Sequence, residues 1–262
     1  MKNLLSLEGR VALVTGAGQG IGRRAALHFA EHGCAAVLVN DYASDRAQAV
    51  AAEVTAAGSR GIPVVGDVTD YQAMERAIGR AAESAGGLNI VVNNAGNAGP
   101  TDGLENLPPF WETGPADWQK WLGTNLYGVL NVNRIAIPLM ATGGSGSIVN
   151  VISDAGRVGE PHLAVYSAAK AGAAGLSRAL AKALGPRKIR VNSVALGGVN
   201  TPGVQSMVRD EEAVRRSLKS YIIRRTGEPE DAANMILFLA SDASSWITGQ
   251  TYGVNGGYST SQ

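Results

Sequence analysis

The stretch VALVTGAGQGIG, residues 11–22, combines the two features that decide the fold. Its first half is a short apolar run without alternation, which is typical of a parallel strand buried on both faces. Its second half places Gly16, Gly20 and Gly22 where the backbone turns sharply into a helix. The first N–H groups of such a helix can donate hydrogen bonds to a pyrophosphate. A tight structural turn is the alternative, because Ile21 stands where a G-x-G-x-x-G pattern begun at Gly16 needs its third glycine.

Apolar runs of the same kind recur along the chain, separated by alanine-rich stretches. Residues 20–33 and 45–58 have helical composition and end in glycine, a usual helix stop. Strands and helices that alternate in this way predict a doubly wound α/β fold, a parallel sheet flanked by helices. No linker or composition shift divides the chain, so we expect a single domain over residues 1–262. The seven expected strands are residues 11–15, 35–39, 62–65, 89–93, 147–152, 189–194 and 251–255.

Composition and charge limit the class of protein. The 262 residues are 45% hydrophobic and 17% charged, which suits a globular chain with a substantial buried core. A net charge of +1 provides no basic face for nucleic acid or an anionic membrane, so we expect a small-molecule partner. No stretch approaches the ~20 apolar residues of a membrane span, and we expect a cytoplasmic location.

The sequence predicts no metal site. Cys34 is the only cysteine, which excludes an internal disulfide and a thiolate cluster. His28 and His32 have a ligand spacing, although no carboxylate motif completes a site. We therefore expect these two histidines on a partly exposed helix face.

The stretch SDAGRVGEPHLAVYSAAK, residues 153–170, carries the chemistry. Tyr166 and Lys170 are four residues apart and share a helix face, so an ammonium can lie beside a phenol. A phenol with a pKa near ~10 is a poor base at neutral pH, and a nearby positive charge favours its phenolate. Ser153 ends an expected core strand, where its hydroxyl can hydrogen-bond a substrate oxygen. The alternative for Tyr166 and Lys170 is a chance pair on a solvated helix face. No G-x-S-x-G elbow surrounds Ser153, which argues against a serine hydrolase.

These residues, with TGAGQGIG at 15–22 and NNAG at 93–96, resemble the classical short-chain dehydrogenase/reductase family. The likeness covers almost the whole chain, through the tail at 224–257. It implies an NAD(P)-dependent alcohol or carbonyl oxidoreductase with a seven-stranded Rossmann sheet, commonly a homotetramer. A nicotinamide cofactor carries only the hydride, so the protein must supply the proton.

The resemblance implies a role for each of four catalytic residues. Tyr166 is the expected acid/base, and Lys170 is expected to move its pKa toward the working range. Ser153 orients the substrate oxygen, and Asn125 holds a water that relays protons to the lysine. Taken alone, Asn125 is only a helical asparagine.

Cofactor choice depends on the end of the second expected strand. An acidic side chain there accepts hydrogen bonds from the ribose hydroxyls and repels a 2′-phosphate, and Asp41 is the candidate, with Asn40 in competition. Gln19 is not basic, so NAD is favoured over NADP. Arg46 can reach back to a phosphate, although we expect it to be a solvated helix residue. The cofactor-binding residues that the resemblance implies are Gly16, Gln19, Gly20, Ile21, Gly22, Asp41, Asp67, Val68, Asn94, Ala95, Gly96, Tyr166, Lys170, Val199 and Thr201.

A substrate lid is expected over residues 202–224. Met207 and Val208 would cover an apolar substrate, and a solvated charged face is the other interpretation. The lid arginines that would meet a phosphate-bearing carrier are Arg209, Arg215 and Arg216. In the loop before the lid, Leu196-Gly197 replaces the Pro-Gly that the family usually has.

The expected function is interconversion of a secondary alcohol and a ketone with NAD(H). The segment SDAGRVGEP, with Asp154 directly after Ser153, is similar to that of enzymes that act on 3-oxoacyl or 3-hydroxyacyl thioesters, including ring-containing acyl compounds. Asp154 can also simply cap a turn. Phe110 and Trp111 can form a substrate wall or a subunit contact. An NADP(H)-dependent carbonyl reductase and a non-catalytic nucleotide-binding protein of the same fold are the alternatives.

Overall fold

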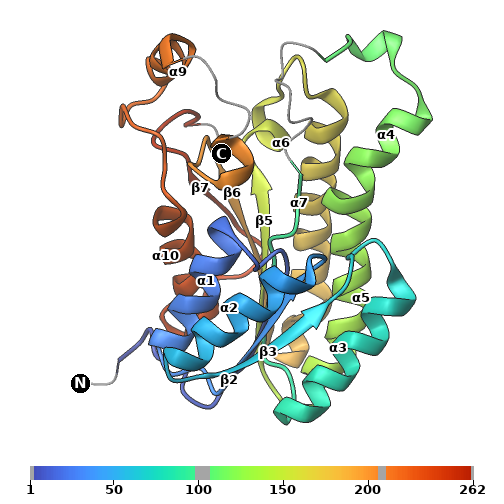
Figure 1. The fold of residues 1–262 in the computed structure, drawn as a ribbon, viewed down its shortest axis with the longest axis vertical. Coiled ribbons are helices and arrows are strands. Elements are labelled where there is room, and N and C mark those ends of the chain that lie inside the picture. The colour runs from blue at the N-terminus through green and yellow to red at the C-terminus, as the bar shows by residue number, and fades with distance from the viewer. Residues whose placement is uncertain (1–2, 98–106, 206–210, 261–262) are drawn as a thin grey trace.

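The computed structural model describes residues 3–97, 107–205 and 211–260. Seven parallel strands form one sheet in the order β3-β2-β1-β4-β5-β6-β7 (Figure 1). The strands are β1 (Val11–Val14), β2 (Ala36–Asp41), β3 (Arg60–Val65), β4 (Ile90–Asn93), β5 (Gly146–Ser153), β6 (Ile189–Leu196) and β7 (Thr251–Val254). All seven expected strands and the doubly wound topology are confirmed.

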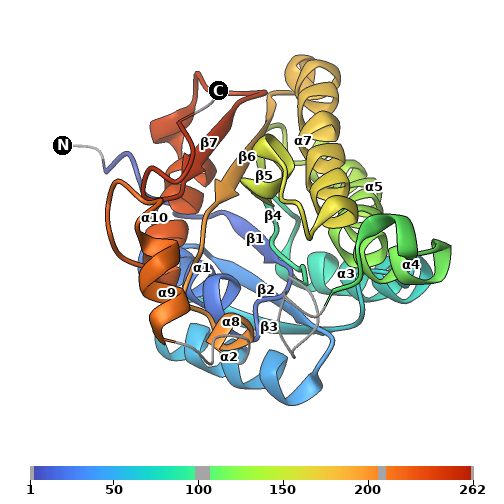
Figure 2. The same cartoon turned by 90° about the horizontal axis from the view of Figure 1, so that it is seen from above.

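Two layers of helices enclose the sheet (Figure 2). One face carries α1 (Gly20–Glu31), α2 (Ser44–Ala56) and α10 (Pro229–Ala240), and the other carries α3 (Tyr71–Ala85), α5 (Gly128–Ala141) and α7 (Ala164–Leu184). The shorter helices are α4 (Pro115–Leu122), α6 (Ala155–Val158), α8 (Pro202–Gln205) and α9 (Glu211–Leu218). Further single turns are Phe110–Glu112, the π-helical turn Gly123–Tyr127, Gly185–Arg187 and Asp242–Ser244.

Local sequence signals set the limits of these helices. Asp70 caps α3, because its carboxylate accepts a hydrogen bond from the N–H of Ala73 at 3.0 Å. Gly86 ends the same helix with φ +84°, a conformation that glycine adopts without strain. Pro229 opens α10 at a position where its missing N–H costs nothing.

Burial along the sheet differs between its centre and its edges. Strands β1, β2 and β4 are buried at every residue, as their apolar runs predict. The edge strands β3 and β7 are largely half-buried or exposed, so burial on both faces was the wrong expectation for them. An edge strand has a neighbour on one side only, and Val65 accordingly reaches the surface.

Because all strands are parallel, their carboxyl ends meet at one edge of the sheet, toward the top of Figure 1. The strand order reverses between β1 and β4, and the loops that follow these strands diverge there. No helix in the described parts of the chain is both long and apolar enough to cross a bilayer.

Candidate active site

A groove of about 590 Å³ crosses the carboxyl ends of β1, β2 and β4. The expected cofactor residues that line it are Gly16, Gln19, Gly20, Ile21, Asp41, Asp67, Val68, Asn94, Ala95, Gly96 and Thr201. Residues that line it without having been expected include Tyr42, Arg46, Asn97 and Thr124. Most of the residues predicted to bind the cofactor therefore share one surface.

The glycine-rich turn after β1 is shaped to hold an anion. Asn94 fixes the turn, because its amide donates to the carbonyls of Thr15 at 3.0 Å and of Gly16 at 3.1 Å. Helix α1 then begins without a side-chain cap and without an acidic residue in its first turn. Uncapped N–H groups at a helix start suit a pyrophosphate, so the residues present fit a dinucleotide.

Four expected cofactor residues do not line the groove: Tyr166 and Lys170, whose positions are described below, and Gly22 and Val199. A Cβ on Gly22 would approach the carbonyl oxygen of Gly16 to 2.3 Å, so this glycine allows the helix to pack against the turn. Val199 is buried, and its backbone pairs with Gly227 in an isolated bridge. The structure therefore gives both residues packing roles, which sequence spacing cannot distinguish from ligand contact.

Asp41 ends β2 beside the groove and is only 4% exposed. Its carboxylate accepts hydrogen bonds from the N–H of Gly18 at 3.1 Å and from the guanidinium of Arg46 at 2.7 Å. Arg46 also donates to Gln19 at 3.1 Å and lies 4.9 Å from the ring centre of Tyr42. The expectation that Arg46 is a solvated helix residue was wrong, since a buried carboxylate draws it into the groove.

Asn40 lines the groove beside Asp41, but its side-chain nitrogen is bonded within the protein. Its side-chain amide donates to the carbonyls of Val64 at 2.9 Å and Gly66 at 3.0 Å. Those bonds tie β2 to the end of β3. Two acidic residues line the groove, the buried Asp41 at the end of β2 and the exposed Asp67 after β3.

Ser153, Tyr166 and Lys170 converge as their spacing predicts. Ser153 is the last residue of β5, and its side chain interacts with the Tyr166 hydroxyl, an interaction that lowers the pKa of that hydroxyl. Lys170 lies one turn after Tyr166 on α7, with its ammonium 5.7 Å from the tyrosine ring centre. The same ammonium donates to the carbonyl of Val151 at 3.1 Å.

Burial dominates the acid–base properties of this set. Desolvation raises the pKa of Tyr166, and its hydrogen bond with Ser153 lowers it by less. Desolvation also lowers the pKa of Lys170 to about 8, since the side chain is only 4% exposed. The expected lowering of the Tyr166 pKa is therefore not found in the protein alone, where burial outweighs the interaction with Ser153.

Asn125 is fully buried in the π-helical turn Gly123–Tyr127. Its amide nitrogen donates to the side chain of Asn97 at 3.0 Å and to the carbonyl of Trp121 at 3.0 Å, and its Oδ1 has no protein partner. A Cβ on Gly96 would lie 2.9 Å from this oxygen and 3.3 Å from the Lys170 ammonium. Asn125 and Lys170 thus face a common space that a side chain at residue 96 would fill.

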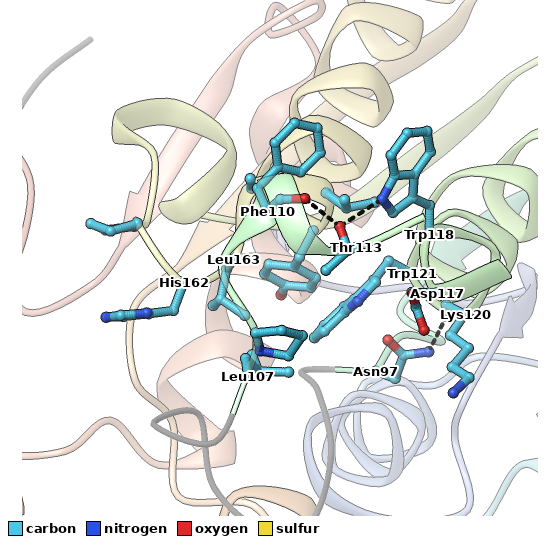
Figure 3. Close-up of a pocket in the computed structure, with 15 residues that line it drawn as sticks. Asn97, Leu107, Phe110, Thr113, Asp117, Trp118, Lys120, Trp121, His162 and Leu163 are labelled. Carbon is cyan, nitrogen blue, oxygen red and sulfur yellow. Dashed lines mark hydrogen bonds between the residues drawn. The ribbon is translucent and has the colours of Figure 1, made fainter. Parts of the chain in front are cut away.

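A second cavity, of about 420 Å³, opens on Tyr166 (Figure 3). Its walls are mostly apolar and include Trp118, Trp121 and Phe110, of which Trp121 meets the ring of Tyr166 edge to face at 5.7 Å. Asn97 lines both this cavity and the groove, so the two are neighbours. The described wall residues are Asn97, Leu107, Pro108, Phe110, Thr113, Asp117, Trp118, Lys120, Trp121, Pro161, His162, Leu163, Ala164, Val165 and Tyr166.

The remaining residues named in the sequence analysis, at the expected pocket mouth, after Ser153 and in the expected lid, lie in different parts of the structure. Phe110 lines the cavity, whereas Trp111 is 82% exposed and does not. Asp154 is buried in an ion pair with Arg157 at 2.9 Å, and does not cap a solvated turn. The expected lid residues Met207, Val208 and Arg209 lie outside the described residues, while Arg215 and Arg216 lie on α9. Among the described residues, no cluster of three or more His, Cys, Asp or Glu side chains is arranged for a metal.

Known proteins similar to this chain cover nearly its whole length. Residues 16–259 match the family model described as enoyl-(acyl carrier protein) reductase. A 3-oxoacyl-[acyl-carrier-protein] reductase of Thermotoga maritima is 38% identical, over 97% of this chain and 99% of its own length. A cis-4-hydroxycyclohexanecarboxylate dehydrogenase of Sinomonas cyclohexanicum is 41% identical, over 95% of this chain and 96% of its own.

A solved structure agrees at the level of the fold. A 7α-hydroxysteroid dehydrogenase, in complex with NADH and 7-oxo glycochenodeoxycholic acid, has a TM-score of 0.90 at 34% identity, with 98% of each chain covered. The seven-stranded sheet, the uncapped start of α1 and the Ser153–Tyr166–Lys170 set fit the same family. The chain therefore belongs to the classical short-chain dehydrogenase/reductase family and is an oxidoreductase that acts at a CH–OH group.

Proposed function

We propose that this protein interconverts a secondary alcohol and a ketone with NAD(H), using Tyr166 as the acid/base. The observation that carries the proposal is the position of Tyr166. The side chain of Ser153 interacts with its hydroxyl, Tyr166 lines a mostly apolar cavity, and Asn97 lines both that cavity and the groove. A substrate in the cavity would thus lie between the acid/base and the cofactor.

Tyr166 and Ser153 would have separate roles at the substrate oxygen. The bound cofactor supplies or accepts the hydride. Tyr166 gives its hydroxyl proton to the carbonyl oxygen during reduction and takes it from the alcohol during oxidation. Ser153 donates a hydrogen bond to the same oxygen and stabilises its developing charge.

Lys170 and Asn125 support Tyr166 in this proposal. The Lys170 ammonium favours the phenolate of Tyr166, which forms whenever Tyr166 has given up its proton. The free Oδ1 of Asn125 faces the same space as Lys170, and a water held there would relay protons. Gly96 keeps that space open.

NAD(H) is the proposed cofactor, because Asp41 is a buried acidic side chain that lines the groove at the end of β2. A carboxylate there accepts hydrogen bonds from ribose hydroxyls and repels a 2′-phosphate. Arg46 favours the competing proposal of NADP(H), since a guanidinium binds phosphate well. Its ion pair with Asp41 at 2.7 Å offsets that attraction.

The proposed substrate is a cyclic alcohol or its ketone. Support comes from the aromatic walls around Tyr166 and from the similar cis-4-hydroxycyclohexanecarboxylate dehydrogenase. A 3-oxoacyl or 3-hydroxyacyl thioester is the second candidate, favoured by the similar 3-oxoacyl reductase of Thermotoga maritima. The acyl part of a thioester would enter the same cavity.

The deciding experiment compares the wild type with Tyr166→Phe. Cyclohexanone, a 7-oxosteroid and a 3-oxoacyl thioester are each offered with NADH and with NADPH, and nicotinamide absorbance is followed. We expect turnover by the wild type, an activity loss of about 10²–10⁴-fold in Tyr166→Phe, and unchanged NADH binding. Tight cofactor binding without turnover of any substrate by the wild type would instead favour a non-catalytic nucleotide-binding protein.

Three wider properties belong to this proposal. We propose one domain over residues 1–262, with a lid at 202–224, because Gly203 and Val204 of that segment line the groove. NADH should then protect the segment from proteolysis. We also propose a homotetramer, supported by exposed apolar side chains such as Trp246 and Ile222. We propose a cytoplasmic location as well. Native mass spectrometry and cell fractionation test these two points.

A further inference from the structure

The four residues Asn255–Tyr258, which follow β7, lie against the loop that joins Ser153 to α7. We call residues 154–163 the serine–tyrosine loop and residues 255–258 the C-terminal strut. Both ends of the serine–tyrosine loop are bonded to the strut, although about 100 residues separate them in the chain.

The first contact is at the beginning of the serine–tyrosine loop. Asp154 is 2% exposed and follows Ser153 directly. One of its carboxylate oxygens accepts a hydrogen bond from the Asn255 amide at 2.6 Å, and the other accepts from Arg157 at 2.9 Å. Because both oxygens are bonded, the Asp154 side chain, next to Ser153, is held between the strut and the serine–tyrosine loop.

The second contact is at the end of the loop, beside the substrate cavity. The hydroxyl of Tyr258 donates to the carboxylate of Glu160. This bond raises the pKa of Tyr258 to about 12, so the hydroxyl stays a donor at neutral and moderately alkaline pH. The next three residues, Pro161, His162 and Leu163, form one wall of the cavity (Figure 3).

The strut is itself held by its other neighbours. Tyr221, which follows α9, packs against Tyr258 with ring centres 5.2 Å apart and accepts a hydrogen bond from the N–H of Gly198 at 2.9 Å. Gly256 accepts from the N–H of Ile223 at 2.8 Å. The strut is therefore fixed on one side and can act as a support on the other.

We propose that the C-terminal strut positions the two ends of the serine–tyrosine loop for separate purposes. Asn255, through Asp154, holds Ser153 in place for the chemical step, and Tyr258, through Glu160, holds the cavity wall that contacts the substrate. Asn255 and Tyr258 are positioning residues, since neither lines the cavity. This inference rests on the proposed function of Ser153 and of the cavity.

The test of the Tyr258 contact is Tyr258→Phe, which removes one hydroxyl and keeps the ring. We expect KM for the ketone to rise by about tenfold, the effect of a lost hydrogen bond to a charged group, with kcat little changed. The matched control is Tyr71→Phe on α3, which removes a tyrosine bond to Glu75 at 2.9 Å far from the cavity. The control should leave both constants unchanged.

The test of the Asn255 contact uses Asn255→Asp, which sets two carboxylates against each other. We expect kcat to fall by about tenfold while KM and NADH affinity change little. The double variant Asp154→Asn with Asn255→Asp exchanges donor and acceptor, and should recover part of the lost kcat. Gln250→Ala, which removes an exposed amide beside β7, is the matched control.

The split between the two constants decides the proposal. A rise in KM for Tyr258→Phe with a fall in kcat for Asn255→Asp supports it. Equal changes in both constants, or none, in variants that remain folded by circular dichroism would overturn it. A wild type that turns over no substrate would overturn the proposed function and this inference with it, whereas an active wild type without the split overturns the inference alone.

Discussion

At the residue scale, the pKa values of Tyr166 and Lys170 predict opposite pH dependences for the two directions of reaction. Oxidation needs the deprotonated tyrosine, whose pKa is raised by burial, so its kcat/KM should rise with pH above neutrality. Reduction needs the protonated form and should fall as pH rises through the same pKa. Lys170 loses its charge above a pKa of about 8, which limits the gain in oxidation at alkaline pH.

The rise in oxidation and its limit near the Lys170 pKa of about 8 are tested by initial rates across pH 6–10, at constant ionic strength. The fall in reduction, which follows the raised Tyr166 pKa, needs the series to continue above pH 10. Oxidation that is fastest at acidic pH would contradict the acid/base role of Tyr166. Lys170→Met should lose the alkaline limit together with most of its activity, because no ammonium then supports the phenolate.

The pair of Asp41 and Arg46 predicts a change of cofactor preference. Asp41→Ala removes the carboxylate that holds the Arg46 guanidinium, so Arg46 becomes free to bind a 2′-phosphate. The ratio of kcat/KM for NADPH over NADH should rise by about tenfold or more. Steady-state kinetics with each cofactor measure the ratio, and Asp41→Ala with Arg46→Ala should lose the gain. An unchanged ratio in Asp41→Ala would remove Asp41 from cofactor selection.

At the element scale, the space around two helical glycines predicts opposite effects of an added methyl group. Gly22 lies where α1 packs on the glycine-rich turn, and Gly79 lies on α3 in open space. A Cβ on Gly22 would meet the backbone oxygen of Gly16 at 2.3 Å, so Gly22→Ala must displace the helix or the turn. We expect a loss of about 1–3 kcal/mol in the free energy of unfolding, with weaker NADH binding. Gly79 on α3 has no atom within 4 Å of its would-be Cβ, and Gly79→Ala should gain up to about 1 kcal/mol.

Urea unfolding and NADH titration of the two variants provide the measurement. Two equally stable variants would show that the turn yields to an added methyl group. Thermal unfolding without NADH measures the loss of stability alone, and the additional stabilisation by NADH measures the loss of cofactor binding.

The same elements show what sequence patterns predict and what they miss. Apolar runs located all seven strands because burial of a parallel strand leaves a local signature in composition. Edge exposure of β3 could not be predicted, since it depends on which strand has no second neighbour. The ion pair of Arg46 with Asp41 was missed for a similar reason, because it depends on how α2 packs beside the end of β2. Motif spacing correctly brought Ser153 to Tyr166, whereas the strut contacts of Asp154 arise only after the C-terminal segment folds back.

At the scale of the whole molecule, the packing of α1 against α10 joins the first and last parts of the chain. His28 is only 6% exposed in that interface, which corrects the expectation of partial exposure for this residue, whereas His32 is half-buried as expected. Its Nε2 lies 2.9 Å from the carboxylate of Glu230 on α10. Arg24 also pairs with Glu230, so one carboxylate of α10 meets two basic side chains of α1.

This interface predicts an acid-sensitive stability. Desolvation and the charge of Arg24 lower the pKa of His28, whereas Glu230 and Glu31 act in the opposite sense and His32 adds to the lowering. The unfolded chain, with an ordinary histidine pKa of about 6.5, therefore binds a proton before the folded chain does. Stability should be complete above that pH and decrease as pH falls through it toward the lower pKa of the folded state. His28→Gln should reduce the loss of unfolding free energy between pH 7 and pH 5.5, measured in urea, and His32→Gln on the same helix is the control. An equal loss in His28→Gln and the wild type would show that other groups set the acid sensitivity, and that the α1–α10 contact tolerates a charged histidine.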